Sequence, residues 1–205
     1  MNLGMIAYFR NEPGRAVEFL EQSVNMARQG GYAPQLSLAL TFLGRTLLWV
    51  NGPQDQRAGA VLEEGLRVAQ AVESRYAIGH ALVTRGDLAW RQGDVAAAMP
   101  LWKQALEVRC QLAERRGLAG CLERLALTQA VNRQFESAAW LFGAADAQHA
   151  ALGVGLRHDE EIDHAQLLGL TRDHLGEAFA TAWAAGQAAS LDEAVSRAAG
   201  HPPAW

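Results

Sequence analysis

A small–large–small pattern occurs four times in this chain of 205 residues, and its spacing constrains the fold more than any other feature. Each copy begins at a small anchor residue and continues with a small, a large and a small residue, which lie 12, 16 and 19 positions later in three copies and two positions further on in the fourth. The copies are Gly86 with Ala98, Trp102 and Ala105; Gly4 with Ala16, Leu20 and Ser23; Ala126 with Ala138, Phe142 and Ala145; and Gly44, after a two-residue insertion near Pro53, with Ala58, Leu62 and Gly65. Small side chains let two helix backbones approach while a large one fills the space beside them, so the pattern predicts antiparallel helix pairs. The anchors lie 40, 42 and 40 residues apart, a spacing typical of stacked helical hairpins.

The phase of this pattern predicts the limits of eight helices. The first helices of the hairpins are expected at about 2–10, 35–50, 75–92 and 116–132, and the second helices at about 14–29, 56–73, 95–114 and 135–151. The intervening turns carry Gly, Pro, Asn and Asp, the residues that interrupt helices. Pro100 lies near the start of its helix, where a proline ring costs least if it falls within the first turn. If the helix begins at Asp94 instead, Pro100 should kink it.

Beyond residues 153–155 the repeat stops, and the remaining chain predicts a helical cap. We expect a polar helix at about 158–174, a break at Leu175-Gly176, a short helix that ends at Gly186 and a last helix with Ser190 as its N-cap. A terminal repeat exposes an apolar face, so Phe179, Trp183, Leu191 and Ala194 should fold back on it. The predicted organisation is therefore a repeat region over 1–153, with its first repeat cut short, and capping helices over 154–205.

The repeat anchors resemble those of the tetratricopeptide repeat, in a longer form. The segment 138–146, Ala-Ala-Trp-Leu-Phe-Gly-Ala-Ala-Asp, and the tail with Leu175-Gly176, Phe179, Trp183, Gly186 and Ser190-Leu191 are similar to the C-terminal repeat region of bacterial multidomain transcriptional regulators, LuxR-type and ATPase-linked. The resemblance implies an all-α, right-handed superhelical solenoid of about four hairpins plus a C-terminal cap. It also implies that the nucleotide site and the DNA-binding helices of such regulators lie outside this segment.

Charge and motif content argue against several classes of function. The net charge is −4 and Lys103 is the only lysine, so a direct nucleic-acid contact is not expected. The sequence has no GxxxxGK[ST] phosphate loop, no Gly-x-Ser-x-Gly and no Cys-His constellation, so we predict no catalytic residues and no cofactor. Cys110 and Cys121 are expected to be small buried residues in a reducing compartment. No apolar run reaches a membrane-spanning length and the start lacks signal-peptide features, which predicts a cytoplasmic protein without membrane contact.

The stretch from His158 to His164 is the best candidate for a metal site, because it combines histidines with carboxylates. Glu160 and Glu161 lie four and three residues before His164, on one helix face, but a third ligand is not evident. A solvated acidic face at a helix N-terminus is the favoured interpretation, and no metal is predicted.

The concave face lined by the first helices is the candidate binding groove. Tryptophan and arginine dominate binding hot spots, and both types fall on this face. The candidate residues are Tyr8, Arg45, Trp49, Asp87, Trp90, Arg91, Glu123 and Leu127. As alternatives, Trp49 and Trp90 could pack between neighbouring helices, and Arg45 could pair with Asp87.

Two hypotheses of function follow from these patterns. The first is a non-catalytic interaction or regulatory module, whose groove binds a protein or peptide, another domain of the same regulator, or a second copy of the chain. The second is a sensor module that binds a small-molecule effector in the same groove. An enzyme ranks third, with no residues assigned to it.

Overall fold

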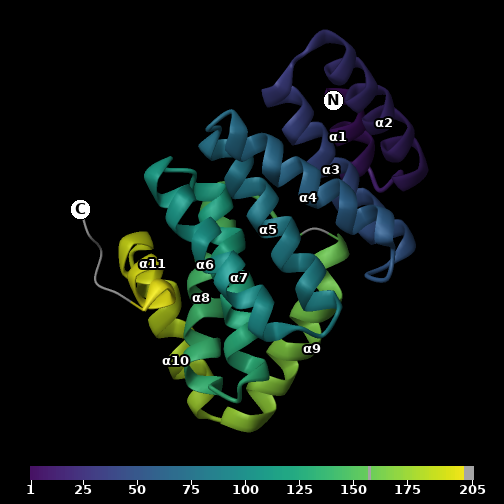
Figure 1. The fold of residues 1–205 in the computed structure, drawn as a ribbon. Coiled ribbons are helices and arrows are strands. Elements are labelled where there is room, and N and C mark those ends of the chain that lie inside the picture. The colour runs from purple at the N-terminus through teal and green to yellow at the C-terminus, as the bar shows by residue number, and fades with distance from the viewer. Residues whose placement is uncertain (157, 201–205) are drawn as a thin grey trace. The chain divides into compact units, whose positions relative to one another are not determined.

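The computed structural model describes residues 1–156 and 158–200, except for the side chains of 158–160 and 162, and within these ranges it contains eleven helices and no strand. The expectation of an all-α chain is therefore confirmed. The chain divides into two compact units, Met1–Val108 and Arg109–Trp205, and each is described by itself. The helices, labelled in Figure 1, are α1 Asn2–Phe9, α2 Pro13–Gly30, α3 Ala33–Asn51, α4 Gln56–Ala71, α5 Arg75–Arg91, α6 Val95–Gln111, α7 Arg115–Val131, α8 Phe135–Leu152, α9 His158–Leu175, α10 Ala178–Ala188 and α11 Leu191–Ala199.

The helix ends follow from local side-chain chemistry. Pro13 begins α2. Backbone N–H groups in the first turn of a helix have no acceptor within the helix, so the N–H that proline lacks is not needed there. Asp55 caps α4 by accepting from the Arg57 backbone N–H at 2.8 Å. The Asn51 side-chain amide donates to the same carboxylate at 2.6 Å and is the main cause that lowers the pKa of Asp55. Such caps satisfy backbone N–H groups that the first turn of a helix leaves open.

In the first unit, the predicted contact of a small anchor with a large residue is confirmed in three hairpins. A Cβ atom added to Gly4 would lie 2.6 Å from Leu20 Cγ, and one added to Gly44 would lie 2.5 Å from Leu62 Cγ. A Cβ atom on Gly86 would lie 2.5 Å from Trp102 Cδ1. Because carbon atoms do not approach this closely, a larger residue at any of these three anchors would force the facing side chain or the helix to shift.

Adjacent helices of the first unit pack in chain order. Contacts join α1 to α2, α2 to α3, α3 to α4 and α4 to α5, and α3 also contacts α5. A continuous apolar core runs from α1 to α4 and includes Ala16, Leu20, Leu40, Leu43 and Ala58. The hairpin of α1 and α2 and the hairpin of α3 and α4 thus share one apolar core.

The second unit has α7 and α8 at its centre, with the last three helices packed on them. Helix α9 contacts α7 and α8, α10 contacts α8, and α11 contacts both α7 and α8 (Figure 1). Phe179 packs against Ala139 of α8, and Trp183 joins the same apolar cluster. Ala194 is fully buried, and Ser190 caps α11 by accepting from the Glu193 backbone N–H at 3.1 Å. Of the four residues expected to fold back, Phe179 and Trp183 pack on α8, Ala194 is buried, and Leu191 is only partly buried.

The helices α8 and α10 touch backbone to backbone. A Cβ atom on Gly186 would overlap the Trp140 carbonyl oxygen and would lie 3.0 Å from the Ala144 backbone nitrogen. A Cβ atom on Gly143 would likewise overlap the Trp183 carbonyl oxygen. The expected end of this helix at Gly186 is therefore wrong, since α10 continues to Ala188 and Gly186 serves the close crossing instead.

Pro100 is the sixth residue of α6, so it lies in the second helical turn rather than the first. Asp94 caps this helix by accepting from the Ala97 backbone N–H at 2.9 Å. The proline thus removes one backbone hydrogen bond inside the helix. Across the ranges that the structure describes, every helix is too short or too polar to cross a membrane.

Replacing Gly186 by alanine should destabilise the fold, because the new methyl group meets backbone atoms that cannot rotate away. We expect Gly186→Ala to lower the free energy of unfolding by at least about 2 kcal/mol, measured by urea denaturation. Gly169→Ala is the matched control, since nothing lies within 4 Å of the added atom in α9. It should raise stability by up to about 1 kcal/mol through helix propensity. Equal effects of the two changes would contradict the close crossing.

Candidate interaction surface

The structure divides the candidate groove residues of the first unit into two classes. Tyr8 and Arg45 are almost completely buried, each with 5% of its surface exposed. The other four, Trp49, Asp87, Trp90 and Arg91, are partly exposed. Only these four can therefore offer side-chain surface to a partner without a change in the fold.

Both tryptophans are also held by aromatic neighbours. The Trp49 ring meets the Tyr8 ring edge-on, with centroids 5.6 Å apart and an interplanar angle of 83°. The Trp90 ring lies 5.6 Å from the Trp102 ring with an angle of 43°. Such contacts contribute about 1 kcal/mol each beyond the buried area, so packing accounts for part of each ring and leaves the rest accessible.

The partly exposed candidates lie near the C-terminal ends of α3 and α5, which a side-chain contact joins. The Gln92 side-chain amide, one residue after α5, donates to the Pro53 carbonyl oxygen in the turn after α3 at 3.0 Å. Helices α3 and α5 also pack directly against each other. We call Trp49, Asp87, Trp90 and Arg91 the α3–α5 surface.

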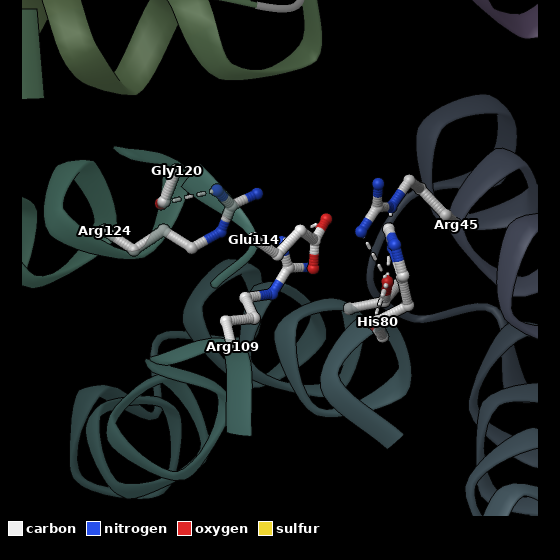
Figure 2. Close-up of polar contacts among 7 residues, drawn as sticks. Arg45, His80, Arg109, Glu114, Gly120 and Arg124 are labelled. Carbon is white, nitrogen blue, oxygen red and sulfur yellow. Dashed lines mark hydrogen bonds and ion pairs between the residues drawn. The ribbon is translucent and has the colours of Figure 1, made fainter. Parts of the chain in front are cut away.

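Arg45 links α3 to α5 inside the first unit. Its Nε and Nη2 atoms both donate to Thr84 Oγ1, at 3.2 and 2.7 Å, and Thr84 Oγ1 in turn donates to the His80 carbonyl oxygen at 3.1 Å (Figure 2). The guanidinium also lies 5.8 Å from the centre of the Phe42 ring. These contacts hold the Arg45 side chain inside the unit. Asp87 of α5 accepts a hydrogen bond from Trp102 Nε1 at 3.1 Å.

In the second unit, the candidates Glu123 and Leu127 are buried, with 3% and 7% of their surfaces exposed. The Glu123 carboxylate is hydrogen-bonded to His164 Nδ1 of α9. The His164 ring in turn meets Phe142 of α8 edge-on, with centroids 5.3 Å apart. Helix α9 therefore lies over the part of α7 where the sequence predicts a groove. Sequence reasoning missed this pairing. The available signal was a histidine in the polar helix α9 together with a glutamate in the mostly apolar helix α7.

A second polar group that the sequence did not indicate connects α6 and α7 of this unit. Arg109 Nη1 lies 3.4 Å from Glu114 Oε1, and Arg124 Nη1 donates to the Gly120 carbonyl oxygen at 2.9 Å (Figure 2). Both arginines are 5% exposed, and Arg109 Nε has no acceptor in the described part of the chain. A Cβ atom on Gly117 would overlap the Arg109 guanidinium, so glycine leaves the space for this cation.

The side chains that the structure describes provide no group of ligands for a metal ion. Among the residues whose side chains the structure describes, no three His, Cys, Asp or Glu residues lie close enough to hold an ion. The side chains of His158, Asp159 and Glu160 lie outside the described residues, and His164 is engaged by Glu123. Cys121 is buried and Cys110 is partly exposed, and the two form no disulfide.

Loss of His164 should destabilise the second unit, because it leaves the Glu123 carboxylate buried without that hydrogen bond. We expect His164→Ala to cost about 2–3 kcal/mol in thermal or urea unfolding. Adding Glu123→Gln should recover part of this loss, since a neutral amide is less costly to bury than a carboxylate. His174→Ala, on an exposed position of the same helix, should cost less. If His164→Ala and His174→Ala lowered the free energy of unfolding equally, the hydrogen bond to Glu123 would not be what holds α9 in place.

No protein-family model matches this chain, and comparison with curated proteins and with solved structures gives no match either.

Proposed function

We propose that the chain is a non-catalytic interaction and regulatory module, a solenoid of tetratricopeptide-like hairpins that presents the α3–α5 surface to a protein or peptide partner. The observation that carries this proposal is the repeated contact of Gly4 with Leu20, Gly44 with Leu62 and Gly86 with Trp102. Hairpins built on one contact place equivalent residues of successive first helices on one surface. Helical repeat scaffolds use such surfaces to bind other proteins.

The chemistry of the α3–α5 surface supports recognition of a partner. Trp49 and Trp90 supply large apolar contact areas, and Arg91 and Asp87 supply a cation and an anion on α5. Because Tyr8 and Trp102 already hold the two rings, little side-chain entropy would be lost when a partner covers them. A partly buried aromatic residue of this kind is typical of a binding anchor.

The regulatory part of the proposal rests on the resemblance to bacterial LuxR-type and ATPase-linked regulators. The packing of Phe179 and Trp183 on α8 is what a cap of such a repeat region requires, and it supports that interpretation. In this view the module is cytoplasmic, and its partner is another protein, a peptide or another domain of the same regulator. The alternative remains a sensor, in which the same groove binds a small effector.

The test is capture of a partner by the intact chain and by surface variants. A partner taken from the source cell and identified by mass spectrometry is purified, and its dissociation constant is measured for each variant. Trp49→Ala and Trp90→Ala should each weaken binding about tenfold or more, as truncation of a hot-spot residue does. Tyr32→Ala is the control, since Tyr32 is 61% exposed at the opposite end of α3.

Helical content measured by circular dichroism must be unchanged for the comparison to hold. Unchanged partner affinity in both tryptophan variants, with the fold intact, would contradict the assignment of the α3–α5 surface. Binding of a metabolite that both variants abolish, without any protein partner, would favour the sensor instead.

A further inference from the structure

The second unit contains an open pocket of about 560 Å³, formed where the last helix meets the beginning of α7. Its lining comes from the end of α6, the first turn of α7 and the first half of α11. This volume lies within the range of about 300–1,000 Å³ that small-molecule sites occupy. None of the lining residues belongs to the α3–α5 surface.

The floor of the pocket is apolar and firmly held. Leu118 of α7 and Val195 of α11 line it, with 4% and 5% of their surfaces exposed, and Leu191 adds a partly buried side chain. Helix α11 packs against α7 and α8, and Ser190 caps it, so its wall of the pocket is fixed by contacts outside the pocket. An apolar ligand group placed here would bury its surface against both α7 and α11, and neither helix would need to move.

Two opposite charges lie at the pocket, one on each wall. Arg115 is the first residue of α7 and Asp192 is the second residue of α11, and both side chains line the pocket and are exposed. Among the side chains that the structure describes, none forms an ion pair or a side-chain hydrogen bond with Arg115 or Asp192. Both charges are thus available to a ligand, and neither neutralises the other.

The Arg115 side of the pocket also favours an anion through its backbone. Glu114 occupies the N-cap position of α7, and its side chain makes no capping hydrogen bond. The positive end of the helix dipole adds to the guanidinium charge at this point. A carboxylate is the anion whose geometry suits a guanidinium best.

From the charges and the floor together we infer that this pocket binds a small zwitterion with an apolar body, an apolar amino acid or a dipeptide of such residues. The ligand carboxylate lies against Arg115 and the α7 N-terminus, its ammonium lies against Asp192, and its side chain covers Leu118, Leu191 and Val195. The ligand touches both α7 and α11. Its binding therefore links the cap to the last hairpin and stabilises the folded chain.

Isothermal titration calorimetry on the full chain tests this site with defined probes. L-Phenylalanine and L-leucyl-L-leucine are the zwitterions, N-acetyl-L-phenylalanine lacks the cation, and L-phenylalaninamide lacks the anion. At least one of the two zwitterions should bind. If L-phenylalanine binds, N-acetyl-L-phenylalanine and L-phenylalaninamide should each bind at least tenfold more weakly than it does. If only the dipeptide binds, N-acetyl-L-leucyl-L-leucine and L-leucyl-L-leucinamide replace the blocked probes.

Charge variants assign the binding to this pocket. Arg115→Gln and Asp192→Asn should each weaken the zwitterion at least tenfold, and in Asp192→Asn the acetylated and free probes should bind equally. Arg67→Gln on α4 and Asp173→Asn on α9 are matched controls, since both residues are exposed and lie outside the pocket. Methyl resonances of Leu118, Leu191 and Val195 should shift on titration.

The inference is overturned if no zwitterion binds at millimolar concentration, or if the pocket variants bind like the controls. Partner capture through the α3–α5 surface involves neither Arg115 nor Asp192. If no zwitterion binds the pocket, the partner-capture experiment is therefore unaffected. If no partner is captured, the calorimetric titration of the pocket is likewise unaffected.

Discussion

Contact between helix backbones at small residues is the constraint on which the rest of this structure depends. At Gly44 and Gly86 the facing side chain of the next helix occupies the space that a Cβ atom would take. At Gly143 and Gly186 the facing group is the backbone itself, so two helices meet with no side chain between them. Short separations of this kind bring many atoms into van der Waals contact at once, and the contacts of each helix pair determine where its exposed residues lie.

The candidate surfaces follow from this packing in different ways. In the α3–α5 surface, each tryptophan ring packs against an aromatic neighbour and stays partly exposed. Tyr8 contacts Trp49, and Trp102 contacts Trp90. The pocket of the second unit forms because α11 meets α7 and α8 while its first half leaves space beside Arg115. The two proposals therefore concern separate sites, with the α3–α5 surface proposed for a macromolecular partner and the pocket proposed for a small ligand.

The helices and the anchor contacts could be predicted from sequence because they depend on local spacing. The period from Gly86 to Trp102 recurs at Gly4 and, with an insertion, at Gly44, and the same residues meet in the structure. The extent of α10 could not be predicted, because a glycine that ends a helix and one that permits a close crossing look alike in sequence. Gly186 has the second role only through Trp140, more than forty residues earlier in the chain.

The surface was predicted less well than the fold. Tyr8 and Arg45 have the right residue types for binding but are buried by neighbouring helices, and Glu123 is covered by His164 of α9. The repeat pattern assigns a face to each residue but does not show which later helix covers that face. The pocket residues Arg115 and Asp192 are brought together only by the fold of the cap, and no spacing in the sequence relates them.

A double-mutant cycle between Gly86 and Trp102 tests the anchor contact most directly. Gly86→Ala alone should destabilise the chain by about 1–3 kcal/mol, because its methyl group meets the indole ring. In a Trp102→Ala background the same change should cost much less, with a coupling energy of at least about 1 kcal/mol from urea unfolding. A coupling energy near zero would show that the two residues do not meet, and it would contradict the hairpin packing on which the α3–α5 surface rests.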